Sequence, residues 1–407
     1  MQTSVMPSSA ITPAIQLPST KRITSIDFLR GLVIVIMALD HVRDYFHADS
    51  MILDPTNLQT TTPLFFFTRW ITHFCAPVFM FLAGTSAFLV GQRKSRKELS
   101  WFLATRGLWL MILELTVVNF GWFFNIHFTS ILLVVIWALG LGMLILSALI
   151  HLPFKLLLAI GLLIVAGHNL LDNIHVPGDG VGAIIWAALH ERRRFTIDGH
   201  ILGTGYPVLP WLGIMITGYC FGSFYKKDVN AATRRKVLRY IGLAVCCLFI
   251  LVRAINIYGD PSPWKLQVSG TFTLLSFLNL TKYPPSLLYT LMTLGPAILL
   301  LSVTENIKGK FLNALTVIGR VPMFFYIVHI YLIHLAAMLA ISLMGHPWSD
   351  MILTSWPWTQ PQLKGYGFSL ATSYGIWIVL VLLLYPLCAW YDKYKSAHKD
   401  KWWLSYL

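Results

Sequence analysis

Residues 368–390 read FSLATSYGIWIVLVLLLYPLCAW and contain no charged side chain. A helical run of roughly 20 such residues crosses the hydrocarbon core of a bilayer. Apolar blocks of comparable length cover 127–148, 236–258 and 284–304. Hydrophobic residues make up 56% of the chain and charged residues 12%, about half the charged share of a soluble domain, and the mean hydropathy is +0.67. The sequence therefore predicts an all-α, polytopic membrane protein.

The positions of the basic residues determine the predicted topology. Lys and Arg gather in the connections at 92–99, 226–236 and 305–311 and near both termini, and positively charged connections stay on the cytoplasmic side. About ten spans, with the N- and C-termini cytoplasmic, place all of these basic clusters on the cytoplasmic side. This topology also accounts for the net charge of +14, so we expect no nucleic-acid partner. The predicted spans are 24–46, 67–91, 102–124, 127–149, 152–171, 205–225, 236–257, 284–304, 313–343 and 368–390.

The apolar run 181–190 is too short to cross a bilayer. A crossing there would also move the basic cluster at 226–239 to the outside. We therefore expect a helix that lies on, or dips into, the outer face.

Three segments make up the predicted organisation. Residues 1–22 are rich in Ser, Thr and Pro and are expected to form a disordered cytoplasmic tail. Residues 23–391 form one transmembrane domain, and residues 392–407 form a basic cytoplasmic tail. The N-terminus lacks the pattern of a secretory signal peptide, so the first span is expected to act as an uncleaved anchor.

The first predicted span carries several ionisable residues. Such residues are energetically costly inside a membrane and usually face a cavity or a partner. Asp27, Arg30, His41 and Asp44 recur at steps that place them on one helical face, with Asp40 on its flank. Asp27 and Arg30 are three residues apart and can form an ion pair. At a rise of about 1.5 Å per residue, Arg30 and His41 are roughly 16 Å apart along the axis. One such charge would be structural, but this many on one face favours a functional site.

Further candidates lie in other spans. Arg69 and His73 precede the apolar part of the second span, Arg253 ends the seventh, and Tyr326 and His329 share a face of the ninth. His329 and His334 are five residues apart and point to different faces, so they are not a metal pair. We expect no metal.

The opening segment resembles a known superfamily. Arg30 and His41 are separated by ten residues, as are the arginine and histidine in the first span of the transmembrane acyltransferases. The chain more closely resembles bacterial relatives of the heparan-alpha-glucosaminide N-acetyltransferase catalytic domain. The matching segments are Arg22-Ile-Thr-Ser-Ile-Asp27-Phe-Leu-Arg30-Gly31, Cys75-Ala-Pro-Val-Phe-Met-Phe-Leu-Ala-Gly-Thr, Tyr206-Pro-Val-Leu-Pro-Trp-Leu-Gly, Asn256-Ile-Tyr-Gly-Asp-Pro, Lys282-Tyr-Pro-Pro-Ser-Leu and Gly319-Arg-Val-Pro-Met-Phe-Phe-Tyr-Ile-Val-His329.

The chain departs from that family at the histidine. In the lysosomal members an asparagine corresponds to His41, and the catalytic histidine comes later, which points here to His47. The aspartate that precedes the shared proline of the second span corresponds here to His73. The resemblance therefore leaves His41, His47 and His73 as alternative catalytic residues.

The resemblance implies transfer of an acyl group, acetyl being favoured, from cytosolic acyl-CoA to a hydroxyl or amine on the outer side, in a bacterial cytoplasmic (inner) membrane. The acceptor is expected to be a carbohydrate. His41 would act as general base or carry the acyl group, with Asp40 or His73 orienting its ring. Membrane lipid is an expected partner, and a homodimer is left open. The expected substrate-binding residues are Asp27, Arg30, Arg69, Arg253, Tyr326 and His329, and the expected CoA-binding residues are Arg22, Arg93, Lys94 and Arg96.

The alternative function is a secondary transporter or proton-coupled permease that uses the same polar stripe as a substrate path. We find no paired helices broken by Gly or Pro in corresponding halves, which argues against it.

Overall fold

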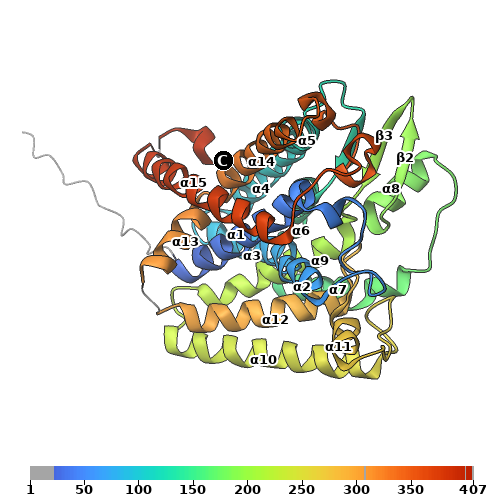
Figure 1. Cartoon of the computed structure of the whole chain (residues 1–407). Helices are drawn as coiled ribbons and strands as arrows, with labels where there is room; N and C mark the ends of the chain where they lie inside the picture. Colours follow the sequence, from blue (N-terminus) through green and yellow to red (C-terminus); the bar gives the residue numbers. More distant parts are fainter. Residues whose placement is uncertain (1–22, 307–308, 399, 406–407) are drawn as a thin grey trace, which may run out of the picture.

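The computed structural model describes residues 23–306, 309–398 and 400–405 (Figure 1). Arg22 and the predicted 1–22 tail lie outside the described residues. The predicted boundary at 391/392 falls inside a helix, because the last long helix continues to Ala397.

Within the described residues, eight helical segments are long and apolar enough to cross a membrane. They confirm the prediction of an all-α polytopic membrane protein. Short breaks divide some segments into successive helices. The helices are α2 (Pro63–Thr72) with α3 (Cys75–Gly91), α4 (Arg96–Leu113) with α5 (Asn119–Phe123), α7 (Phe154–Gly167), α9 (Val208–Phe221), α10 (Ala231–Ile255), α12 (Leu287–Thr304), α14 (Pro322–Leu343) and α15 (Leu370–Ala397).

The two remaining predicted spans are also helical. α1 (Thr24–Phe46) has 23 residues, but it carries too many charges to qualify on apolar composition. α6 (Val135–Leu149) is apolar but has only 15 residues. The segment at 181–190 forms α8 (Val181–His190), a helix of 10 residues, which is shorter than a membrane crossing requires.

Two predicted spans differ in detail from the structure. The span at 313–343 is two helices, α13 (Lys310–Arg320) and α14, because Pro322 lacks an N–H and sits at the first turn of a new helix. The span at 127–149 begins as a strand, β1 (Ser130–Leu133), before α6. Glu114 explains the late start of α6, because its Oε2 accepts the backbone N–H groups of Ile136 and Trp137 at 2.9 and 3.0 Å.

A small sheet stands at one end of the helices, beside α8 (Figure 1). Its strands are β1, β2 (Arg194–Ile197) and β3 (His200–Thr204), in the order β1-β3-β2. β1 pairs parallel to β3, with Ser130 opposite Ile201, and β2 pairs antiparallel to β3. The sequence analysis did not predict these strands. A further short helix, α11 (Gly270–Leu278), precedes α12.

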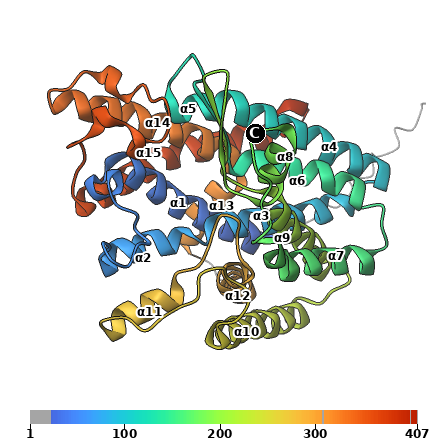
Figure 2. The ribbon, with the colours of Figure 1, turned by 90° about the vertical axis from the view of Figure 1, so that its right-hand side faces the viewer.

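α1 lies in the middle of the molecule, and α10 and α12 lie side by side at its edge (Figures 1 and 2). α1 packs on α3, α13, α14 and α15. Cys75 and Trp377 each donate a hydrogen bond to a backbone carbonyl of α1, those of Val33 and Val35. Most of α1 is buried, so its polar side chains face protein rather than lipid.

Two glycines bring α1 and α13 into backbone contact. A Cβ on Gly31 would lie 1.8 Å from the carbonyl oxygen of Leu315, and a Cβ on Gly319 would lie 1.8 Å from that of Asp27. Small residues at such crossings let membrane helices approach closely. The approach also brings the Gly319 carbonyl to Arg30, whose Nη1 donates to it at 3.3 Å.

We expect Gly319→Ala to destabilise the protein by about 1–3 kcal/mol, because the added methyl group forces the two helices apart. Thermal unfolding of the detergent-solubilised protein measures the effect. Gly375→Ala is the matched control, since nothing lies within 4 Å of its Cβ position. Equal melting temperatures for the two variants would contradict the close α1–α13 contact.

Candidate active site

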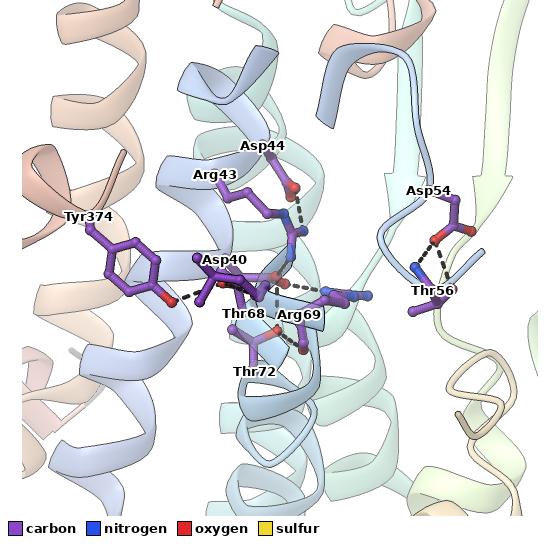
Figure 3. Close-up of polar contacts among 10 residues, drawn as sticks. Asp40, Arg43, Asp44, Asp54, Thr56, Thr68, Arg69, Thr72 and Tyr374 are labelled. Carbon is purple, nitrogen blue, oxygen red and sulfur yellow. Dashed lines mark hydrogen bonds and ion pairs between the residues drawn. The ribbon is translucent and has the colours of Figure 1, made fainter. Parts of the chain in front are cut away.

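The polar residues at the end of α1 form an ion-pair cluster around Asp40 (Figure 3). Asp40 binds the Arg43 guanidinium at 2.7 Å and also accepts a hydrogen bond from Arg69 of α2. The Thr72 hydroxyl donates to Asp40 at 2.9 Å. Arg43 in turn pairs with Asp44 at 2.6 Å. The two arginines offset the two carboxylates, which lowers the cost of placing charge at this depth.

His41 is oriented by another histidine rather than by Asp40 or His73. His41 Nδ1 lies 2.8 Å from Nε2 of His329, whose Nδ1 lies 3.0 Å from the carbonyl oxygen of Phe325. A carbonyl only accepts, so neutral His329 carries its proton on Nδ1 and accepts with Nε2. His41 must then donate from Nδ1, which leaves the lone pair on its Nε2. No hydrogen bond joins that nitrogen to the described residues.

His41 lines a cavity of about 870 Å³ that we call the sheet-side cavity. Residues of β1 and β3 form part of its wall. The other residues that matter here are Asp40, Arg43, Asp44, Arg69, His73, Trp122, Arg192, Lys282 and Tyr283. Lys282 and Arg192 form no ion pair with a described residue, so the cavity offers cationic groups that are not already paired with a carboxylate.

A second cavity of about 1310 Å³, the basic cavity, surrounds Arg30. Arg30 is held by three residues: it donates to Asp27 at 3.0 Å, to the Ser86 hydroxyl at 2.8 Å and to the Gly319 carbonyl. Asp27 is the one carboxylate that lines this cavity among the described residues. The cationic residues that line it are Arg30, Arg93, Lys94, Arg106, Lys226, Lys227, Arg234, Arg320 and Lys395.

The two cavities meet beside His41. Met37, Phe79, Val135 and Tyr326 line both of them. The Tyr326 ring lies 6.4 Å from that of His41, centroid to centroid. These four side chains therefore separate the basic cavity from the sheet-side cavity, which His41 lines.

Several predicted site residues lie elsewhere. His47 lines neither cavity, and its Nδ1 lies 3.1 Å from the carbonyl oxygen of Phe368. Arg253 also lines neither, and its guanidinium donates to four backbone carbonyls, those of Ser262, Ser276, Phe277 and Asn279. Arg96 donates to the carbonyl of His151 and does not line the basic cavity.

His73 lies in the sheet-side cavity and is buried, but not against His41. Its ring packs on Tyr289 at 5.3 Å between centroids, and its Nδ1 has no hydrogen-bond partner among the described residues. It can therefore contact a bound molecule, while the orientation of His41 depends on His329.

The protein-family model for the catalytic domain of heparan-alpha-glucosaminide N-acetyltransferase matches residues 22–258 of the sequence. This range is more than half of the chain and contains α1 and the Asp40 cluster. The chain belongs to this family. The family is one of transmembrane acetyltransferases, so the chain is a transmembrane acyltransferase by membership. A comparison with curated proteins found no match.

Part of the site of this family member lies beyond the matched residues. Lys282, Tyr283, Tyr326 and His329 all follow residue 258, where the match ends. Lys282 and Tyr283 belong to a segment that resembles the family, but the sequence alone predicted no role for either residue. The sequence offered one signal for Lys282: it follows the buried-span arginine Arg253. In the structure Arg253 binds the connection from which Lys282 reaches the cavity.

Positive charge dominates the surroundings of Tyr283. Burial alone would raise the pKa of its hydroxyl, but Lys282, Arg69 and Arg192 outweigh burial and lower that pKa to about 7. Tyr206 also donates a hydrogen bond to the Tyr283 oxygen. The phenolate form is therefore stabilised at the wall of the cavity.

We expect one tyrosine to ionise near pH 7, which ultraviolet difference spectra of tyrosinate would detect in the native protein. An acid whose folded pKa lies below its unfolded value of about 10 contributes stability above that value. The contribution declines as the pH falls from 10 towards 7 and is absent below the folded pKa. Tyr283→Phe should remove the transition, and Lys282→Met should move it to higher pH. A Tyr283→Phe variant with an unchanged titration would contradict the assignment.

Proposed function

We propose that the protein transfers an acetyl group from cytosolic acetyl-CoA to a hydroxyl or amine, on a sugar, at the opposite side of the membrane. The observation that carries the proposal is that His41 lines the sheet-side cavity close to Tyr326, one of the four residues shared with the basic cavity. A donor in the basic cavity and an acceptor in the sheet-side cavity would reach the same imidazole. Family membership supplies the acyl-transfer chemistry.

The basic cavity suits the donor. CoA carries several phosphate groups, and Arg and Lys side chains bind phosphate through charge-assisted hydrogen bonds. Arg93 and Lys94 lie in the connection between α3 and α4, and Arg30 lies on α1, the helix that also carries His41. In this arrangement the phosphates bind among the basic residues, and the pantetheine arm passes Arg30 with its thioester next to Met37 and Tyr326.

The sheet-side cavity suits the acceptor. Lys282 and Arg192 can bind polar or anionic substituents of a carbohydrate. Trp122 and Trp356 line the same cavity and can contact a sugar ring. Trp122 also lies edge-on to His41, with 4.7 Å between the ring centroids. The reacting hydroxyl or amine would then stand next to His41 Nε2.

In the proposed step, His41 Nε2 removes a proton from the acceptor as the acceptor's oxygen or nitrogen attacks the thioester carbonyl. The carbon–sulfur bond breaks, and the CoA thiolate leaves. His41 returns the proton to that sulfur, which yields free CoA and neutral imidazole. His329 is a positioning residue. Its Nε2 accepts the hydrogen bond from Nδ1–H of His41 in every step, so the His41 proton stays on Nδ1 and Nε2 of His41 remains the base.

We expect His41→Ala to lower kcat by about 10²–10⁴-fold, the usual contribution of a general base. His47→Ala is the matched control and should change kcat little, because His47 lines neither cavity. His329→Ala should lower kcat with little change in the KM for acetyl-CoA. Release of CoA with glucosamine as the acceptor probe measures all three variants.

Wild-type turnover in both His41→Ala and His47→Ala would refute the proposed chemistry. Loss of turnover in His47→Ala alone would move the base to that residue. In either case the donor site could still be tested by binding.

We expect purified protein to bind acetyl-CoA, and Arg93→Ala with Lys94→Ala to weaken binding by about 10-fold or more, because charge-assisted contacts to phosphate are lost. Arg96→Ala with Lys97→Ala removes the same charge from the adjoining first turn of α4 but should bind as wild type, since neither residue lines the basic cavity. Titration calorimetry at two salt concentrations measures the affinities. Absence of acetyl-CoA binding would favour a transporter that uses the same path.

A further inference from the structure

Three potential metal ligands meet near α8, outside both cavities. His168 begins the short helical turn His168–Leu171 at the end of α7, Asp172 follows that turn, and His190 ends α8. One ligand atom from each lies within 4.8 Å of those of the other two. Both histidines are buried, with 3% of their surface exposed.

The spacing of the ligand atoms fits a tetrahedral metal ion. His168 Nδ1 lies 3.3 Å from His190 Nε2, and His190 Nε2 lies 3.8 Å from Asp172 Oδ1. Two nitrogens that bind one Zn²⁺ tetrahedrally, each at about 2.0–2.1 Å, are separated by about 3.3–3.4 Å. The nitrogen pair therefore already has the required separation, and the carboxylate needs only a small movement.

Neighbouring groups direct these ligands inward. The Asn169 amide donates to Asp172 Oδ2 at 2.8 Å, which leaves Oδ1 for His190 and the space between the rings. His168 and His190 also each interact with a backbone carbonyl, that of Pro285 and that of His168. Carbonyl and amide partners of this kind are typical of the residues around metal-bound histidine and carboxylate.

We propose that His168, Asp172 and His190 bind one Zn²⁺ ion, with a water molecule as the fourth ligand. Two imidazoles and a carboxylate are a ligand set that zinc uses in proteins. This site was not expected from the sequence, in which the three residues lie in two segments and match no metal-binding motif. The site requires the fold to bring α7 and α8 together.

The ion would hold together parts of the wall of the sheet-side cavity. Arg192 follows His190 by two residues, and Pro285 belongs to the same connection as Lys282 and Tyr283. Zinc at this point would link α8 to the end of α7, against which that connection packs. No step of the proposed acyl transfer passes through it.

The test uses the full-length protein in detergent, dialysed with ZnCl₂ and then against metal-free buffer. Elemental analysis should find one zinc per wild-type chain. Co²⁺ in place of Zn²⁺ should give the visible absorption bands of a tetrahedral site. His190→Ala and Asp172→Asn should each lower zinc affinity by at least about 10-fold, measured by competition with a chromophoric chelator.

His200→Ala and His346→Ala are matched controls, because both side chains are exposed and lie outside the cluster. They should retain one zinc per chain. The Co²⁺ spectrum needs no variant, so it decides the question even if a substitution prevents folding. A wild-type chain without bound zinc, a Co²⁺ sample without tetrahedral bands, or ligand variants that bind zinc like wild type would each overturn the proposal.

Discussion

The pairing of Asp40 with Arg43 and Arg69 is the interaction on which the rest of the site depends. A lone carboxylate at this depth would carry a large desolvation cost, and so would either arginine. Together with Asp44 they form a nearly neutral cluster that joins the end of α1 to α2. His41, the next residue along α1, projects about 100° around the helix from Asp40, towards His329 on α14. The His41 ring, which lines the sheet-side cavity, is positioned by a partner more than 280 residues away in the chain.

Much of the fold could be predicted from the sequence, because membrane spans are set by the length and apolarity of local segments. The predictions failed where local composition and tertiary contacts disagree. Residues 130–133 are as apolar as the helix that follows, yet they form a strand because β3 supplies a partner. The span at 313–343 looked continuous, but Pro322 starts a new helix and Gly319 brings the preceding one against α1.

The candidate site was predictable only in part. Helical periodicity placed Asp27, Arg30, His41 and Asp44 on one face, and Asp27 does bind Arg30. Periodicity gives no distance between helices, so it could not show that His329 contacts His41, or that His47 turns towards Phe368. Basic residues expected at the membrane edge for topological reasons, such as Lys226 and Lys227, also line the basic cavity. Their two explanations are compatible, since the same positive charge can orient the chain and bind phosphate.

The thin layer formed by Met37, Phe79, Val135 and Tyr326 has an electrical consequence. If the two cavities open to opposite sides of the membrane, as the proposed function requires, water in both would reduce the low-dielectric thickness at this point to a few side chains. The membrane potential would then fall mostly across that layer rather than across about 30 Å of hydrocarbon. An elementary charge that crosses the layer would experience about 2.3 kcal/mol per 100 mV. Three of the four residues are apolar, so the layer is an ion barrier that an uncharged acetyl group can pass at no electrical cost.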